Sequence, residues 1–204
     1  MNRICKEPIT EVAIDITDIQ YTNIEKENDK CIFFVACRMI YRKGIDFLLD
    51  ALTKIPENLN YQVRIVGDGP ELSHLQKRCK KNGNLSKHVY FTGAIPYTKM
   101  ECEYIKADVF IMPSIRETTG TVLLEAMSKG IPVITINKFG GAILFDKNTG
   151  WLYNGNNKEQ YVENLKSAIL ECILNPNEIV RKGKNACCNL STEVLVHKAT
   201  CLKC

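Results

Sequence analysis

The chain has 204 residues, of which 45% are apolar and 25% charged, the composition of a soluble globular protein with about one full domain. Its formal charge of +4 is mild and excludes the concentrated basic surface of a dedicated nucleic-acid binder. No apolar run approaches the roughly 18 residues that span a bilayer, and the first residues lack the apolar stretch of a secretory signal, so we expect a cytoplasmic protein.

Residues 1–30 are mixed and end in a polar run, and we expect them to form a leader or connecting segment. After them, short apolar runs rich in Val, Ile and Phe alternate with helical patterns. The predicted strands cover residues 31–37, 61–66, 88–91, 109–112 and 132–136. The predicted helices cover residues 45–52, 97–106, 121–129 and 157–174, and a further helix opens at Pro70.

Alternating strands and helices require parallel strands with right-handed crossovers. We therefore predict an α/β fold, a doubly wound and mainly parallel Rossmann-like sheet, over residues 31–177. Residues 178–204 are expected to form a carboxy-terminal helix or tail. In this architecture ligands bind at the carboxyl ends of the strands, so the loops that follow the strands are the places to look for chemistry.

The first of these loops is basic. Arg38, Arg42 and Lys43 precede the helix that begins near Ile45. A helix amino terminus already favours an anion, and Arg and Lys side chains suit phosphate oxygens. The alternative is an ordinary solvated basic turn.

The second loop, Val66-Gly67-Asp68-Gly69-Pro70, follows the second predicted strand. Two glycines after a buried strand are also found in dinucleotide-binding loops, but the third glycine is missing and a proline opens the helix. The fingerprint of an NAD-binding loop therefore fails, and we interpret this loop as a tight strand-to-helix turn.

The third loop, residues 113–127, leads from a strand through polar residues into a helix. Glu117 lies in the loop and Glu125 inside the helix, on a face that is otherwise apolar. A carboxylate there needs a partner, and the hydroxyls of a ligand would serve. Gly120 permits close backbone approach, and the amides of Thr121 and Val122 point beyond the helix start. The alternative is a helix with one acid that reaches solvent.

The carboxy-terminal residues hold an adjacent pair, Cys187-Cys188, then His197 and a Cys201-x-x-Cys204 pair. Zinc ligands usually come as two C-x-x-C elements on turns, and here one pair is adjacent instead. We favour a partly ordered tail, while zinc binding stays open.

Taken in order, these segments resemble the donor-binding domain of the retaining family 4 glycosyltransferases, which have two facing Rossmann-like domains (the GT-B fold). The matching elements are Arg38-x4-Lys43-Gly44, the V-G-x-G-P turn at 66–70, the F-x-G segment at 91–93, and P-S-x-x-E-x2-G-x4-E-A-M at 113–127. G-x-P-V-I at 130–134, Gly140-Gly141 and T-G-x-L at 149–152 follow. The resemblance covers roughly residues 31–175.

The resemblance implies a role for each matching residue. Arg38 and Lys43 would hold the donor diphosphate and stabilise the leaving nucleotide, and with Glu117, beside the donor sugar, they would be the catalytic residues. Glu125 would accept hydrogen bonds from the ribose hydroxyls, and the backbone near Ile95 would face the base.

In the same family, amides that match Gly120, Thr121 and Val122 contact the sugar and phosphate. The resemblance further implies transfer of a sugar from a nucleoside-diphosphate sugar, with retention at the anomeric carbon, in polysaccharide or glycolipid synthesis. Cations and helix-end amides can replace a divalent metal, so no metal or other cofactor is expected.

Three departures from the family pattern leave questions open. Thr118-Thr119 stands where the family has Gly-Phe, and Leu144 where it commonly has an acid, so the base, the sugar and the acceptor are not readable. We also expect the amino-terminal acceptor domain to come from a missing part or a partner subunit, and any peripheral membrane association to run through that half. A catalytically silent nucleotide-sugar-binding module is the alternative function; an NAD-dependent enzyme is disfavoured by the failed glycine fingerprint.

Overall fold

The computed structural model describes residues 30–115, 121–138, 142 and 144–201, with side chains up to residue 189. In this part of the chain, six parallel strands form one sheet in the order β3-β2-β1-β4-β5-β6. They are β1 (Cys31–Ala36), β2 (Tyr61–Val66), β3 (Val89–Gly93), β4 (Val109–Met112), β5 (Val133–Ile136) and β6 (Gly150–Tyr153). The strand order reverses between β1 and β4, so the predicted doubly wound α/β sheet is confirmed.

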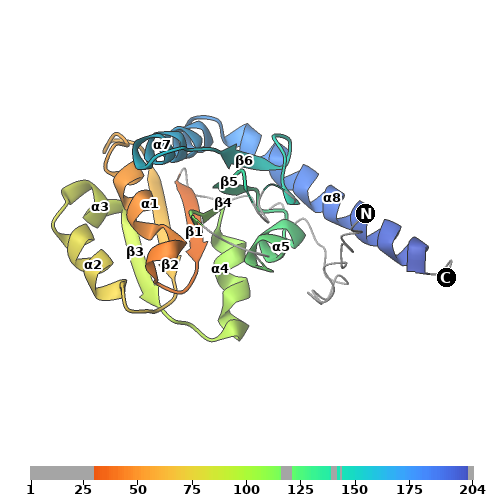
Figure 1. Ribbon diagram of the computed structural model, residues 1–204, viewed down its shortest axis with the longest axis horizontal. Helices are drawn as coiled ribbons and strands as arrows, with labels where there is room; N and C mark the ends of the chain where they lie inside the picture. The colour runs from red at the N-terminus through yellow and green to blue at the C-terminus, as the bar shows by residue number, and fades with distance from the viewer. Residues whose placement is uncertain (1–29, 116–120, 139–141, 143, 202–204) are drawn as a thin grey trace, which may run out of the picture.

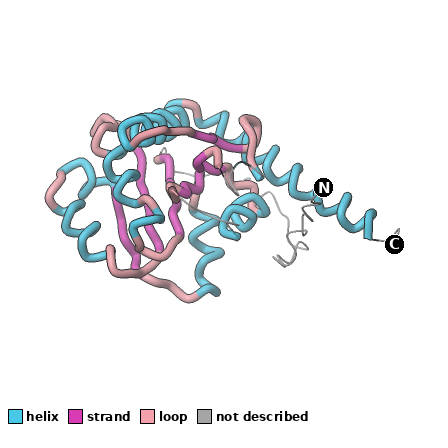
Figure 2. Tube along the Cα trace, in the orientation of Figure 1, coloured by secondary structure: helices cyan, strands magenta, loops and turns pink. Residues whose placement is uncertain are grey.

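Helices cover both faces of this sheet (Figures 1 and 2). They are α1 (Ile45–Leu52), α2 (Leu72–Lys80), α3 (Gly83–His88), α4 (Met100–Lys106), α5 (Thr121–Ser128), α7 (Lys158–Leu174) and α8 (Pro176–Cys201). Short 3-10 turns at Tyr41–Lys43 and Tyr97–Lys99 precede α1 and α4. The far half of α8 extends away from the body of the domain (Figure 1). Across the described residues, no helix is long and apolar enough to cross a membrane.

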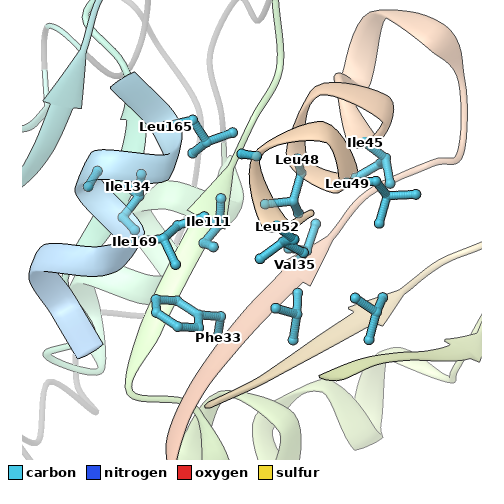
Figure 3. Close-up of a cluster of buried hydrophobic side chains, with 14 of the residues drawn as sticks. Phe33, Val35, Ile45, Leu48, Leu49, Leu52, Ile111, Ile134, Leu165 and Ile169 are labelled. Carbon is cyan, nitrogen blue, oxygen red and sulfur yellow. The ribbon is translucent and has the colours of Figure 1, made fainter. Parts of the chain in front are cut away.

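Two hydrophobic clusters fill the space between sheet and helices, because successive strand residues point to opposite faces. Phe33 and Val35 of β1 belong to the first cluster, together with residues of α1 and α7 (Figure 3). Residues of α2 and α3 complete this cluster. Phe34, between them in sequence, belongs to the second cluster, with α4, α5 and Ala186 of α8. All three side chains are at most 1% exposed, and burial of such a side chain contributes about 1.5–3 kcal/mol.

The junction of β1 and β4 is fixed at its amino end by Asp108. The amide of Ile32 donates to Asp108 Oδ2 at 2.7 Å, and the Asp108 amide donates to the Ile32 carbonyl at 2.8 Å. These two bonds set the register of the strands between which the order reverses, and therefore the relative position of the loops at their carboxyl ends.

Two elements were not predicted. Helix α3 is only six residues long, and its one strong local signal is Asn82, whose side chain accepts from the Leu85 amide at 3.0 Å. The prediction instead began a strand at residue 88, but His88 ends this helix and stacks on Tyr61. Strand β6 has four residues and was identified only as part of a motif; its Trp and Tyr suit a strand.

Candidate functional site

Four loops meet at the carboxyl ends of β3, β2, β1 and β4, and the backbone joins them in series. The hydrogen bonds run from Gly67 N to Gly93 O (2.9 Å), from Met39 N to Asp68 O (2.8 Å) and from Ile115 N to Arg42 O (3.0 Å). The loops that the sequence singled out therefore form one continuous edge. This edge includes the point where the strand order reverses, which is the usual ligand position in such sheets.

Glycines allow these loops to approach so closely. Gly44 has φ 69°, and an added Cβ would lie 2.1 Å from the carbonyl oxygen of Pro113. Gly67 has φ 134°, and its Cβ would lie 1.9 Å from the carbonyl oxygen of Cys37. The predicted tight strand-to-helix turn at 66–70 is therefore confirmed, and both glycines are required because they pack on backbone rather than on mobile side chains.

The basic loop is anchored by one residue and presents others to solvent. Met39 is completely buried in the first cluster, whereas Arg38, two residues beyond the end of β1, is exposed. Lys43 is half-buried in the 3-10 turn, and Gly44 provides the amino-terminal cap of α1. Lys43 and exposed Arg42 thus directly precede the amino terminus of α1, whose free amides add to their positive field. The predicted contacts of Arg38 and Lys43 with phosphate stay predictions.

Glu125 has a partner within the protein that the sequence analysis did not find. The hydroxyl of Tyr104 on α4 donates to Glu125 Oε2 at 2.8 Å. Tyr104 is 2% exposed, and burial, followed by the charge of Glu125, raises the pKa of its hydroxyl well above the usual range. The hydroxyl therefore remains a donor, and the acid on the apolar face of α5 is held by a tyrosine even before any ligand is considered.

The structure describes only some of the other predicted site residues. Thr121 is exposed at the first residue of α5, and Val122 behind it is half-buried. Ile95 lies two residues beyond β3 and packs its half-buried side chain against the second cluster. Glu117 and Gly120 lie outside the described residues, so their predicted roles stay predictions.

A second tyrosine holds the start of the loop after β4. Tyr161 on α7 donates to the carbonyl oxygen of Pro113 at 3.0 Å and lies 3.3 Å from that of Ser114. Tyr153 on β6 in turn donates to the hydroxyl of Tyr161 at 3.2 Å. Sequence reasoning missed this relay because both tyrosines look like ordinary core residues.

A groove of about 660 Å³ lies elsewhere, along β6 between α7 and α8. Lys182 on its wall is 5% exposed, lies 4.9 Å from the centre of the Trp151 ring and donates to the carbonyls of Lys147 and Gly150. None of the predicted site residues lines this groove. Lys182 thus has main-chain partners, and the carboxyl-end edge, with its exposed cation and its carboxylate, is the better candidate site.

The carboxy-terminal cysteines do not gather in the part of the chain that the structure describes. Cys187 is buried and Cys188 exposed on α8, while the side chains of His197, Cys201 and Cys204 lie outside the described set. Among the described residues, no three His, Cys, Asp or Glu side chains are grouped as metal ligands.

Comparison with known proteins agrees with the predicted family. The model of the family "Glycosyl transferases group 1" matches residues 16–186. An uncharacterised glycosyltransferase of Methanocaldococcus jannaschii is 36% identical over 134 residues, which cover 64% of this chain and 34% of that protein. A GDP-mannose-dependent alpha-(1-6)-phosphatidylinositol monomannoside mannosyltransferase of Mycobacterium tuberculosis is 32% identical over 155 residues, covering 72% and 39%.

Among solved structures, the sucrose-phosphate synthase of Thermosynechococcus elongatus is similar with a TM-score of 0.71 and 27% identity, over 86% of this chain and 45% of that one. The chain thus spans between a third and two fifths of the length of these two relatives and less than half of this solved structure. Because the family model matches most of the chain, from ahead of β1 into α8, this protein belongs to the group 1 glycosyl transferases.

Proposed function

We propose that this chain is the donor-binding half of a retaining glycosyltransferase that moves a sugar from a nucleoside-diphosphate sugar to an acceptor in polysaccharide or glycolipid synthesis. The observation that carries the proposal is the edge at which the loops after β1 and β4 meet, with exposed Arg38 and half-buried Lys43 on one side and Glu125 on the other. The name of the mycobacterial relative, a GDP-mannose-dependent enzyme, supports this class of donor.

In the proposed complex, the diphosphate lies at the amino terminus of α1 against Arg38 and Lys43. The ribose hydroxyls reach Glu125, and the base lies by the backbone near Ile95. The donor sugar lies by Glu117, within reach of the amides of residues 120–122. The loops after β3, β1 and β4 that carry these residues all lie at the carboxyl edge of the sheet.

These residues would act on the charge that develops as the sugar leaves. Departure of a nucleoside diphosphate places negative charge on its oxygens, and fixed cations and helix-end amides stabilise that charge without reorganisation. The acceptor would attack on the face that the diphosphate leaves, with the leaving phosphate taking the proton. A further domain or a partner subunit would provide the face that binds the acceptor.

A nucleoside diphosphate should raise the thermal stability of this chain. At about one hundred times its dissociation constant, a ligand adds about 2.7 kcal/mol, which is roughly 5–10 °C for a domain of this size. We expect a concentration-dependent shift with one of UDP, GDP and ADP, measured by thermal unfolding, and none with NAD. A shift with NAD alone would contradict the proposal, as would the absence of any shift.

Replacing Lys43 with alanine should weaken the binding of the nucleoside diphosphate but not that of the nucleoside. Loss of a hydrogen bond to a charged phosphate costs about 1.5–3 kcal/mol, or roughly tenfold to a hundredfold in dissociation constant, whereas the nucleoside makes no phosphate contact. Titration calorimetry of both ligands measures the difference.

Lys80→Ala is the matched control for the loss of one positive charge. Lys80 is exposed at the last residue of α2, and it belongs to none of the loops that form the candidate edge. Equal losses for the diphosphate and the nucleoside, or an equal effect of Lys80→Ala, would show that the basic loop does not bind phosphate.

A further inference from the structure

The contact between Tyr104 and Glu125 joins two helices that follow different strands. Tyr104 lies on α4, after β3, and Glu125 lies on α5, after β4. The hydroxyl of Tyr104 is 2.8 Å from Glu125 Oε2 and 3.5 Å from the carbonyl oxygen of Val122, one turn earlier in α5. Because the hydroxyl has one hydrogen, the short contact to the carboxylate is the hydrogen bond that it donates.

The ring of Tyr104 is fixed by the sheet rather than by the site. It packs edge-on against Phe34 of β1, with ring centroids 5.0 Å apart and an interplanar angle of 89°. Phe110 of β4 lies on the same ring at 5.9 Å, and all three rings are almost completely buried. The position of the hydroxyl is therefore set by the two strands between which the strand order reverses.

Glu125, in contrast, is half-buried and has a flexible side chain. A hydrogen bond from a fixed hydroxyl removes most of this freedom and selects one orientation of the carboxylate. It occupies one lone pair on Oε2 and leaves Oε1 to accept from a ligand. An unpartnered glutamate would have to become ordered each time a ligand bound, at a cost to affinity.

We propose that Tyr104 is a positioning residue that orients the Glu125 carboxylate toward the hydroxyls of the donor ribose. This inference rests on the proposed function, since it requires a nucleotide at the edge formed by the loops after β1 and β4. It adds that recognition of the ribose depends on a residue which does not contact the ligand.

The test compares Tyr104→Phe with the wild-type chain on two ligands. The first is the nucleoside diphosphate that shifts the thermal unfolding of the wild-type chain, and the second is its 2′,3′-dideoxy analogue. Phenylalanine keeps the ring and removes only the donor. We expect Tyr104→Phe to weaken the binding of the ribonucleotide roughly threefold to tenfold, the effect of one lost hydrogen bond, and to leave the binding of the dideoxy analogue unchanged.

The ratio of the two dissociation constants within one variant is the main readout, because it does not depend on how much of that variant is folded. Tyr61→Phe is the matched control, since it removes a buried hydroxyl from β2 that has no hydrogen-bond partner among the described residues. It should leave the ratio as in the wild-type chain. In a Glu125→Ala background, Tyr104→Phe should have no further effect on the ratio.

The outcomes separate the two proposals. If Glu125→Ala weakens the ribonucleotide selectively while Tyr104→Phe leaves the ratio unchanged, the positioning role is wrong and the proposed function stands. If Tyr104→Phe weakens the binding of both ligands equally, Tyr104 acts only through packing and the positioning role is likewise wrong. If the wild-type chain binds none of the nucleoside diphosphates, the proposed function itself fails.

Discussion

Replacing Gly44 with alanine should lower the free energy of unfolding by about 2–5 kcal/mol. A left-handed conformation costs an L-residue about 1–2 kcal/mol, and overpacking against fixed atoms costs about 1–3 kcal/mol more. Both costs apply at this position, where φ is 69° and the new Cβ would lie 2.1 Å from the Pro113 carbonyl oxygen. Thermal unfolding should show a fall of about 10 °C in Tm.

Gly93→Ala separates the two costs. Gly93 has nearly the same backbone conformation, with φ 74°, but an added Cβ would have no neighbour within 4 Å. This variant should lose only the conformational part, about 1–2 kcal/mol. Losses of the same size at both positions would show that the loops after β1 and β4 separate easily and that their close contact is not what glycine provides.

The contact between Gly44 and Pro113 also matters for the binding of the nucleotide. Gly44 follows directly on Lys43 and caps α1, so a shift away from Pro113 would displace the basic loop relative to α5. We therefore expect the folded fraction of Gly44→Ala to bind nucleoside diphosphate more weakly than Gly93→Ala. Titration calorimetry at a temperature where both variants are folded compares the two directly.

Raising the pH from 10 to 12 should lower the free energy of unfolding by at least about 4 kcal/mol. Burial raises the pKa of Tyr61 and of Tyr161 to about 12, above the value near 10 in the unfolded chain. Between these values the unfolded chain has released protons that the folded chain retains, so stability present below pH 10 is lost as the pH rises toward 12. Two pKa units in each of two residues correspond to about 5 kcal/mol in full, of which about 4 kcal/mol falls between pH 10 and 12. Burial also raises the pKa values of Tyr104 and Tyr153 well above 10, so these tyrosines add to the loss.

Other buried groups modify this transition without reversing it. Burial raises the pKa of the Cys79 thiol to about 11, so its contribution is lost from about pH 9 upward. Burial lowers the pKa of Lys182, so its contribution rises with pH and is complete near its unfolded value of 10.5, before most of the tyrosine transition. Urea unfolding at each pH measures the sum, and constant stability between pH 9 and 12 would contradict the prediction.

Two tyrosine-to-phenylalanine variants test which residues cause the loss of stability at high pH. Tyr61→Phe removes one of the shifted groups and a hydroxyl with no partner in the described part of the chain, so stability at pH 7 should be unchanged or higher. Tyr161→Phe removes a second shifted group but also the hydrogen bond to the Pro113 carbonyl, so it should cost about 1–3 kcal/mol at pH 7. Both variants should lose less stability than the wild-type chain between pH 10 and 12.

Several features of the fold could be predicted from the sequence because neighbouring residues encode them. The strand at 109–112 and the helix at 45–52 were predicted with their observed bounds, since each is a short apolar run or an apolar stripe with clear ends. The basic loop and the glycine turn follow from local residue types in the same way. Strand alternation then required a parallel sheet, and the rule for such sheets placed the candidate site at the strand ends.

The sequence also led to the family, because its motifs recur in order over most of the chain and the family model matches that region. It did not reveal α3 or β6, which are too short for a periodic pattern to show. Their positions are set by packing on the rest of the sheet, which can override weak local preference.

The residues that support the site can be identified only from the folded chain. Tyr104 and Glu125 are 21 residues apart in the chain, and Tyr161 reaches Pro113 across 48 residues. In the sequence, each tyrosine looks like an ordinary apolar position of a helix, and nothing local identifies the partner of its hydroxyl. The sequence indicated most of the elements, the fold class and the family. The folded sheet set the hydrogen-bond partners, because a hydrogen bond forms only between groups that packing brings within about 3 Å of each other.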